Sequence, residues 1–441
     1  MSSFVLSSSP GITGNLNIPG DKSISHRALI LSSLIKCSVQ ISNLNEGEDV
    51  SHTRKALARL GVDIQDTDKN RVNVQSLTAF TEPKCPLYLG NSGTSARLLM
   101  GLLAPYEFET HFLGDVSLQK RPMKRIIDPL SFMGVSFQHT NGHLPLVQTG
   151  NKNLKAISYR LPIPSAQLKS ALLIAGLSAQ GITRITEPAL SRDHTEKLMQ
   201  FLGMPIKVYF DGQERVAEVV GPYYPHCQDD VIRLDVPGDP SAAAFWIVAS
   251  LLVPDSNLRI NDVCWNPFRS EFMNVLKKMG AQIQLIAKPS KMGETCVDVI
   301  SSTSSLQGIE IDKDLAPSLI DEYPILAVAA SFAKGQSVFR GLGELRFKES
   351  DRLQAIETNL KICGVRCYTQ GDDLFIEGGS FSSPGSIEIY SDYDHRIAMA
   401  FSIFALASKH SIIIHQTETV ASSYPDFYKT LFGFLDFDSC Y

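Results

Sequence analysis

Two series of hydrophobic segments alternate along the chain. In the first series, an amphipathic helical stretch ends in a glycine that precedes a strand-like run. A glycine in this place is the usual left-handed terminator of a helix. The six glycines recur every 69 to 84 residues, as Gly61, Gly134, Gly203, Gly280, Gly364 and Gly433. Five of the six runs are followed by a polar turn and a second strand, so the pattern predicts helix, glycine and hairpin, repeated.

The second series consists of stretches that are apolar nearly all round and begin with a polar residue or a glycine. Helices of this kind are typical of a buried layer. Their starts lie 72 to 82 residues apart, at Asp21, Gly93, Ser165, Asp239, Asp321 and Asp394. Because the two series keep in phase, they predict six repeats. Each repeat has a strand, a buried helix, a second strand, an amphipathic helix and two further strands.

Two near-copies of one motif indicate how the six repeats divide. PGDK occupies residues 19–22 and PGDP residues 237–240, each just before a buried helix. If both mark crossings between two α/β domains of three repeats, one domain spans residues 20–237. The other then consists of residues 1–19 and 238–441. We expect the two short crossing strands to act as a hinge, and small-molecule sites favour the cleft beside such a hinge.

Composition and charge narrow the class of protein. Of the 441 residues 44% are hydrophobic and 20% are charged, which excludes intrinsic disorder. A net charge of −5 argues against a nucleic-acid or polybasic membrane partner. The longest apolar stretch, Ala242 to Val253, is too short to span a bilayer, and the first residues lack the pattern of a signal peptide. Eight scattered cysteines with no C-x-x-C pair predict a reduced, cytoplasmic protein without structural zinc or disulfides.

The polar residues of interest lie at the starts of the buried helices. A helix N-terminus offers unpaired N–H groups and about half a positive charge to an anion. Lys22, Ser23 and Arg27 share the first such helix, where a cation, a hydroxyl and a guanidinium predict a phosphate or carboxylate clamp. An N-cap beside a solvated Lys/Arg face is the plainer alternative. Capping does not explain why Gln167, or the His-Arg pair at 395–396, enters a helix that is otherwise apolar.

Two loops and one helix start add ionisable groups. Residues 119–125 (QKRPMKR) form a basic patch, which by itself is typical of a solvated face. Residues 346–352 (RFKESDR) alternate cations and acids, as a salt-bridged helix start does. Asp321 opens a buried helix, so it is either an N-cap or a tuned acid or base. Nucleotide-loop, nucleophile-elbow and metalloprotease motifs are absent from the sequence, so these cations predict substrates that bring their own phosphates and carboxylates.

Eight segments carry a family signature in order through the six repeats. They run from about Pro19 to Asp426 and read PGDKSISHRALI, GNSGTSARLL, KRPMKRIIDPL, SAQLKSALLIAG, SRDHTEKL, DEYPILAVAA, ELRFKESDRL and DHRIAMAFS. These segments resemble the 5-enolpyruvylshikimate-3-phosphate (EPSP) synthase family. The resemblance implies two inside-out α/β domains, each of three βαβαββ units. It also implies transfer of the enolpyruvyl group of phosphoenolpyruvate to the 5-hydroxyl of shikimate 3-phosphate, with release of phosphate and without a metal or cofactor.

The resemblance also implies roles for individual residues. Asp321 matches the proton acceptor at the 5-hydroxyl and Glu349 matches the proton donor. Lys22 matches a catalytic residue that also binds both substrates. The residues implied to bind shikimate 3-phosphate are Lys22, Ser23, Arg27, Ser165, Ala166, Gln167, Asp321 and Lys348. Those implied to bind phosphoenolpyruvate are Lys22, Gly93, Arg121, Gln167, Arg352 and Arg396. The 20–237 domain would mainly hold shikimate 3-phosphate, and the other domain would supply phosphoenolpyruvate contacts and the acid and base.

Two positions bear on the phosphoenolpyruvate pocket. Ser422 stands where many family members carry a lysine, so one cation of that pocket is in question. Gly93 stands where some glyphosate-tolerant members carry alanine. Because no methyl group intrudes there, we predict that glyphosate inhibits the protein.

Two other functions compete with this interpretation. The related transferase that acts on UDP-N-acetylglucosamine shares the fold, but it presents a reactive cysteine in a loop of the second repeat. The corresponding segment here, LGDVSLQKRPMKR, contains no cysteine. A non-catalytic, anion-binding homologue is the other alternative, against which Lys22, Asp321 and Glu349 are all present. We expect a monomer with small-molecule partners only.

Overall fold

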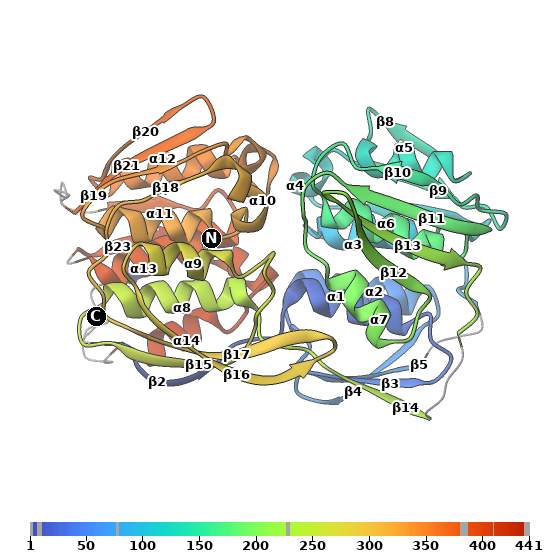
Figure 1. The fold of residues 1–441 in the computed structure, drawn as a ribbon, viewed down its shortest axis with the longest axis horizontal. Coiled ribbons are helices and arrows are strands. Elements are labelled where there is room, and N and C mark those ends of the chain that lie inside the picture. Colours follow the sequence, from blue (N-terminus) through green and yellow to red (C-terminus); the bar gives the residue numbers. More distant parts are fainter. Residues whose placement is uncertain are drawn as a thin grey trace. The chain divides into compact units, whose positions relative to one another are not determined.

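The computed structural model describes residues 3–6, 11–75, 79–225, 230–379, 387–408 and 410–435 (Figure 1). The chain divides into two compact units. The Lys22 unit consists of Gly20–Val236 and Ser290–Glu294. The Asp321 unit consists of Met1–Pro19, Pro237–Pro289 and Thr295–Tyr441. The chain therefore passes between the units inside PGDK and just before PGDP.

The Lys22 unit contains three four-stranded sheets. In each sheet the first two strands are parallel and the remaining pairs are antiparallel. In sheet order they are β14 (Val231–Asp235), β3 (Ser38–Ser42), β5 (Arg71–Gln75) and β4 (Asp63–Asp68); β6 (Leu87–Tyr88), β7 (Glu109–Leu113), β9 (His143–Thr149) and β8 (Ser136–Thr140); and β10 (Ser158–Arg160), β11 (Gly181–Glu187), β13 (Glu214–Gly221) and β12 (Ile206–Asp211).

The helices of the Lys22 unit form two sets, which we call inner, for helices buried almost throughout, and outer, for helices with an exposed face. The inner helices are α1 (Lys22–Ser32), α3 (Gly93–Leu102) and α6 (Ala166–Gly176). The outer helices are α2 (Glu48–Arg59), α4 (Val116–Lys120), α5 (Lys124–Phe132) and α7 (His194–Phe201). Helices α3 and α6 approach so closely that a Cβ on Gly101 would lie 2.2 Å from the carbonyl oxygen of Ala171. Only a glycine permits that approach.

Within the described residues, the Asp321 unit repeats the plan with two four-stranded sheets and one three-stranded sheet. In sheet order the strands are β2 (Thr13–Asn17), β15 (Asn257–Cys264), β17 (Glu294–Ser302) and β16 (Gln282–Lys291); β18 (Glu310–Ile311), β19 (Gly335–Phe339), β21 (Asp373–Gly378) and β20 (Arg366–Gln370); and β1 (Ser3–Leu6), β23 (Ile412–His415) and β22 (Ile387–Tyr390).

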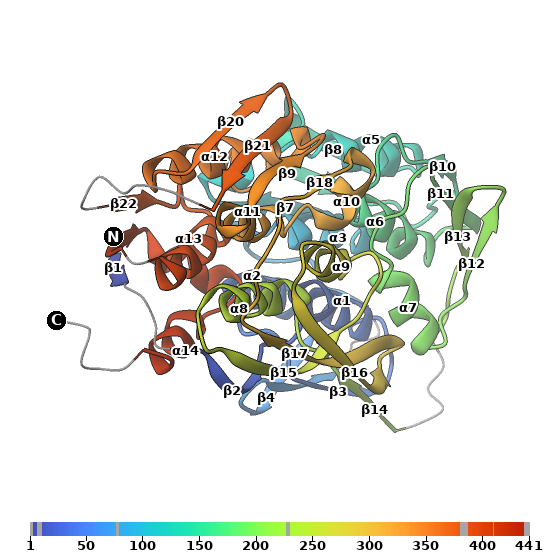
Figure 2. The same ribbon diagram turned by 60° about the vertical axis from the view of Figure 1, so that its left-hand side comes forward.

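The inner helices of the Asp321 unit are α8 (Pro240–Leu252), α11 (Tyr323–Phe332) and α13 (His395–Ala407). Every residue of α8 from Pro240 to Leu251 is buried, as its apolar sequence predicts. The other helices are α9 (Glu271–Lys278), α10 (Ala316–Leu319), α12 (Arg352–Ile362), α14 (Phe427–Gly433) and the 3-10 turns Lys313–Leu315, Gly343–Phe347 and Thr417–Ser422. The sheet that contains β15 lies along α8 in both views (Figures 1 and 2).

Helices inside and sheets outside confirm the predicted fold class, a two-domain inside-out α/β protein. In the described residues the six sheets correspond to the six repeats, but two of them include a strand that directly precedes a helix of the other unit. β2 precedes α1 in the chain, yet it pairs in parallel with β15. β14 precedes α8, yet it pairs in parallel with β3, with Val231 opposite Ser38. At the two PGD motifs, strand and following helix therefore belong to different units.

Five of the six predicted helix terminators are confirmed. Gly61, Gly134, Gly203 and Gly280 have φ of 97°, 107°, 67° and 98°, and Gly364 has 81°. The left-handed region favours glycine because it lacks a Cβ.

The prediction for Gly433 is wrong. Gly433 is the last residue of α14, and Phe434 after it stays right-handed, with φ −94° and ψ −11°. The predicted run FLDF begins at Phe434 with no strand, and its residues 436–437 lie outside the described part of the chain. The sixth sheet takes its antiparallel strand from β1 instead, where Phe4 pairs with Ile414. Of the helices in the described ranges, none has the length and apolar run that crossing a bilayer requires.

Candidate active-site residues

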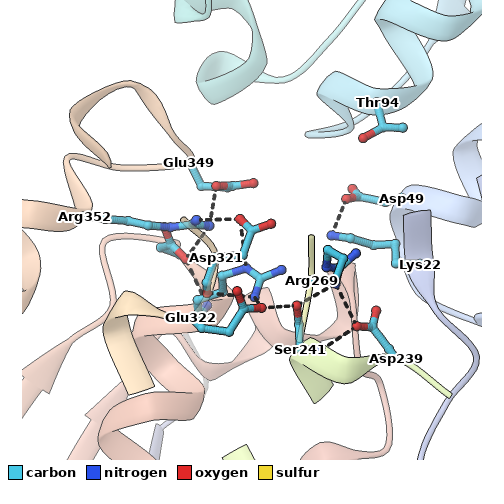
Figure 3. A network of polar contacts seen from close by, with 12 residues as sticks. Lys22, Asp49, Thr94, Asp239, Ser241, Arg269, Asp321, Glu322, Glu349 and Arg352 are labelled. Atoms are coloured by element: carbon cyan, nitrogen blue, oxygen red, sulfur yellow. Dashed lines mark hydrogen bonds and ion pairs between the residues drawn. The ribbon is translucent and has the colours of Figure 1, made fainter. Parts of the chain in front are cut away.

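The start of α1 carries an ion pair. The carboxylate of Asp21 caps the helix by accepting from the amide of Ile24 at 2.8 Å. Lys22 follows as the first helical residue, and its Nζ lies 3.0 Å from Oδ2 of Asp49 in the first turn of α2 (Figure 3). Both side chains are largely buried. The ammonium of Lys22 is thus held at a helix start by a carboxylate that sequence reasoning did not single out.

Arg27, one turn further along α1, is 3% exposed. Its Nη1 donates to the carbonyl of Ser23 at 2.8 Å, which places the two predicted clamp residues on one face of the helix. Its Nε donates to Oγ1 of Thr195 at 2.7 Å and its Nη2 to Oγ of Ser170 at 3.0 Å. These three acceptors are neutral oxygens from three different elements, and together they orient the guanidinium.

The starts of α3 and α6 are tied together by side chains. Arg97 donates to Oε1 of Gln167 at 2.6 Å, and Nε2 of Gln167 donates to Oγ1 of Thr94 at 2.9 Å. Ser165 caps α6 by accepting from the amide of Leu168 at 3.3 Å, and the predicted residue Ala166 is the first of that helix. The amide of Gln167 is therefore fixed between an arginine and a threonine, which explains its place in an apolar helix.

Gly93 opens α3 beside two guanidinium groups. A Cβ at this position would lie 2.6 Å from Nη1 of Arg97 and 3.3 Å from Nη1 of Arg121. Arg121 is 9% exposed and donates to Oδ1 of Asn91, whereas Lys120 and Lys124 on either side of it are exposed. The basic patch is therefore not a uniform solvated face, because Arg121 turns inward.

In the Asp321 unit, Arg352 binds three carboxylates (Figure 3). Its side chain is fully buried at the start of α12. Nε lies 2.7 Å from Oδ2 of Asp394, Nη1 lies 3.3 Å from Oδ1 of Asp321, and Nη2 donates to Glu349. Although burial disfavours the charge, the three carboxylates raise the pKa of Arg352. Lys348, partly buried, directly precedes Glu349 after a 3-10 turn.

Asp321 lies between two arginines. Besides Arg352, Arg396 contacts it through Nη1, which donates to the backbone carbonyl of Asp321 at 2.9 Å. Nε of Arg396 lies 3.7 Å from the Asp321 carboxylate. The N-cap of α11 is Glu322, which makes no capping bond with its side chain. Asp321 is therefore engaged by side chains from α12 and α13 and does not serve as the cap of its helix.

Sequence reasoning missed a buried group next to these residues. Arg269, 1% exposed, donates to Oγ of Ser241 at 2.7 Å and lies 3.2 Å from Oδ1 of Asp239. Ser241 in turn donates to Glu322. The repeated PGD motif was a signal for Asp239, but Arg269 lies in an ordinary loop sequence that gave none.

One group of residues has the spacing of a metal site. One ligand atom from each of Asp193, His194 and Glu294 lies within 4.8 Å of the others. Nδ1 of His194 is 2.7 Å from Glu294, and Nζ of Lys197 is 2.8 Å from the other oxygen of that carboxylate. Although burial alone raises it, His194 and Lys197 lower the pKa of Glu294 to about 2. Lys197 already supplies a cation, so the group is an ion-paired cluster.

The closely spaced cysteines Cys363 and Cys367 are both buried and free. Burial raises the pKa of Cys363 to about 12, and burial together with Glu357 raises the pKa of Cys367 to about 11. A thiol with so high a pKa is a poor nucleophile and a poor metal ligand.

The predicted site residues fall into two groups, one in each unit. The Lys22 unit holds Lys22, Ser23, Arg27, Gly93, Arg121, Ser165, Ala166 and Gln167. The Asp321 unit holds Asp321, Lys348, Glu349, Arg352 and Arg396. Ser422 ends a 3-10 turn in the Asp321 unit, and its buried hydroxyl makes no hydrogen bond within the described part of the chain.

Comparison with known proteins gives one consistent family. Residues 7–431 match the family model of EPSP synthase (3-phosphoshikimate 1-carboxyvinyltransferase). The 3-phosphoshikimate 1-carboxyvinyltransferase of Chelativorans sp. (strain BNC1) is 42% identical over 429 residues, which cover 96% of this chain and 95% of the relative. The enzyme of the same name from Bartonella tribocorum is 43% identical over 423 residues, 95% of each chain.

Solved structures that superimpose on this chain include a member of the same family. The EPSP synthase from Acinetobacter baumannii superimposes with a TM-score of 0.83 at 38% identity and covers 97% of this chain and 96% of that one. The enolpyruvyl transferase NikO from Streptomyces tendae, at 16% identity, has a TM-score of 0.74 over 98% of this chain and 97% of its own. The second likeness shows the shared fold alone.

Proposed function

Since the chain belongs to the EPSP synthase family, the 3-phosphoshikimate 1-carboxyvinyltransferases, we propose that it transfers the enolpyruvyl group of phosphoenolpyruvate to the 5-hydroxyl of shikimate 3-phosphate and releases phosphate. One observation carries the proposal furthest: Asp321 and Glu349 bind the same buried guanidinium, that of Arg352. Two carboxylates beside a cation can serve a reaction in which one proton is removed and another is added.

In the proposed reaction Asp321 accepts the proton of the 5-hydroxyl and Glu349 protonates the methylene carbon of phosphoenolpyruvate. The C–O bond that forms gives a tetrahedral intermediate. Phosphate then leaves while a proton of the new methyl group returns to Glu349, which restores the double bond; the proton taken by Asp321 leaves with the phosphate. Arg352 and Arg396 bind the anionic groups of phosphoenolpyruvate. These groups would replace the protein's own carboxylates on Arg352, which frees Asp321 and Glu349 for proton transfer.

The Lys22 unit supplies the contacts to the phosphorylated sugar acid in this proposal. Arg27 is buried, and neutral oxygens orient its guanidinium, which in this proposal binds an anionic group of the substrate. Lys22 exchanges Asp49 for a substrate oxygen, and Ser23, Ser165 and Gln167 offer hydrogen bonds. Lys348 adds a cation beside Glu349 in the Asp321 unit.

We extend the proposal to inhibition by glyphosate, with Gly93 as the reason. Its missing side chain leaves Arg97 and Arg121 side by side, two guanidinium groups that suit a compact anion. We further propose that the enzyme acts as a monomer in the cytoplasm and needs no cofactor.

The test is phosphate release with both substrates present, comparing the wild type with Asp321→Asn and Lys22→Ala. We expect both variants to lose at least a hundredfold in kcat/KM. Matched controls are Asp372→Asn and Lys152→Ala, whose ion pairs are exposed and whose rates should stay within twofold. Phosphate release with UDP-N-acetylglucosamine in place of shikimate 3-phosphate, or binding of both substrates without any release, would overturn the proposal.

A further inference from the structure

The two hydroxyls that hold Arg27 come from elements far along the chain. Thr195 lies on α7 and Ser170 on α6, 168 and 143 residues from the arginine. The two hydroxyl oxygens are also 2.6 Å apart, so they hydrogen-bond to each other. Ser170 and Thr195 are each 1% exposed, so water does not compete for these bonds. Together with the carbonyl of Ser23, the pair fixes Nε and both terminal nitrogens of the guanidinium.

A buried ion cluster joins the residues next to this hydroxyl pair in the chain. Lys169, the neighbour of Ser170, lies 2.7 Å from Glu196, the neighbour of Thr195. Lys169 also lies 2.7 Å from Glu187, and Arg215 lies 3.2 Å from Glu196. The same two helices are therefore joined twice, by charges on one side and by hydroxyls on the side of Arg27. Charges buried this deeply are costly to separate, so the spacing of α6 and α7 is held firmly.

We propose that Thr195 and Ser170 are positioning residues, whose hydroxyl pair sets the orientation of Arg27 toward the phosphorylated substrate. The inference rests on the proposed function, because it takes shikimate 3-phosphate as the ligand that Arg27 binds. A long arginine side chain has many rotamers, and two fixed acceptors remove that freedom before the ligand arrives. The affinity for shikimate 3-phosphate therefore depends on two side chains that act through Arg27 and need not touch the substrate.

The test uses the full chain and measures the Kd of shikimate 3-phosphate by calorimetry, with the KM for phosphoenolpyruvate from phosphate release. Thr195→Val keeps the shape and removes the hydroxyl. It should raise the Kd of shikimate 3-phosphate roughly tenfold, the effect of one hydrogen bond to a charged group, while the KM for phosphoenolpyruvate changes less than twofold. Thr195→Ser should restore the wild-type Kd. Ser170→Ala, which removes the longer of the two bonds, should raise the Kd about threefold.

The matched control is Thr183→Val. Its hydroxyl is as deeply buried, in the same unit, but it makes no hydrogen bond within the described part of the chain. This variant should bind shikimate 3-phosphate as the wild type does. The inference is overturned if Thr195→Val leaves the Kd unchanged, if Thr183→Val raises it equally, or if the affinities for both substrates fall together with the melting temperature.

The outcomes separate this inference from the proposed function. If the wild type released no phosphate, the proposed function would fail on its own. If the wild type is active and Arg27→Met loses affinity for shikimate 3-phosphate while Thr195→Val and Ser170→Ala do not, only the positioning role fails.

Discussion

Arg27 in α1 and Arg352 at the start of α12 are both buried arginines, yet the groups that hydrogen-bond to them differ. Arg27 is held by two hydroxyls and a carbonyl. Arg352 is held by three carboxylates. The neutral oxygens orient the guanidinium of Arg27, whereas the carboxylates on Arg352 must be displaced before that guanidinium can bind another anion. We propose that Arg27 binds an anion of the substrate and that Arg352 keeps the acid and the base beside a cation.

The largest expected effect comes from removing the charge of Arg352. In Arg352→Met three carboxylates remain close together without their common cation, so we expect a loss of about 3–5 kcal/mol in the free energy of unfolding. Urea denaturation measures it. A loss below about 1 kcal/mol would show that the carboxylates do not depend on this arginine, and the comparison would then break.

A second effect concerns acid stability, through the ion pair of Glu294 in the Lys22 unit. Its pKa falls from 4.5 in the unfolded chain to about 2 in the folded one. The stabilisation is therefore complete above about pH 4.5 and is lost as the pH falls toward 2, about 3 kcal/mol in all. The stability gap between the wild type and Glu294→Gln should narrow by about 2 kcal/mol between pH 7 and pH 3. The exposed Glu310→Gln is the control, and an equal narrowing there would refute the assignment.

Arg27→Met should behave differently from Arg352→Met. The variant loses the hydrogen bonds to Thr195, Ser170 and the Ser23 carbonyl, but the two hydroxyls still bond to each other, so the free energy of unfolding should fall by only about 1–2 kcal/mol. Affinity for shikimate 3-phosphate should fall about a hundredfold. Calorimetry and urea denaturation of the same preparations give both quantities. A stability loss equal to that of Arg352→Met would remove the distinction between the two arginines.

The smallest effect sharpens the comparison at a second pair of guanidinium groups. In Gly93→Ala the new methyl pushes the end of Arg97 aside, which a flexible side chain tolerates. We therefore expect normal folding and about a tenfold higher inhibition constant for glyphosate, about 1.4 kcal/mol. Gly433→Ala is the control, because its Cβ would meet nothing within 4 Å. An unchanged inhibition constant would contradict the steric explanation.

Local pattern predicted much of the fold. Nearby residues determine the structure of α8 and of the five helix ends at glycine, so the apolar run and the glycines were enough to predict them. The two PGD motifs predicted that residues 1–19 belong with 238–441 and that the other domain runs to 237, and β2 and β14 lie accordingly. The partner of each strand was beyond such reasoning, because nothing in Thr13–Asn17 specifies β15. The prediction of a strand after Gly433 was wrong for a similar reason. The strand that completes this repeat's sheet, β1, comes from the other end of the chain.

The site shows the same limit. Polar residues that break an apolar helix start, such as Gln167 and Arg396, were visible in the sequence because they conflict with their surroundings. The groups that hold them were not visible. Asp49 and Arg269 lie in segments with ordinary composition, and Thr195 lies in the signature segment SRDHTEKL without a role of its own there. Only the folded chain brings these residues to Lys22, Ser241 and Arg27. It stays a prediction that the Lys22 unit mainly holds shikimate 3-phosphate and that the Asp321 unit supplies phosphoenolpyruvate contacts and the acid and base.

The most direct test of the account is a titration of shikimate 3-phosphate into Arg27→Lys and Arg352→Lys, each of which keeps its positive charge. Lysine cannot reproduce the fork that meets two hydroxyls at Arg27 or three carboxylates at Arg352. The account predicts that Arg27→Lys raises the Kd at least tenfold and that Arg352→Lys leaves it within threefold. The opposite order, or equal losses in both variants, would contradict the division of labour between the two arginines.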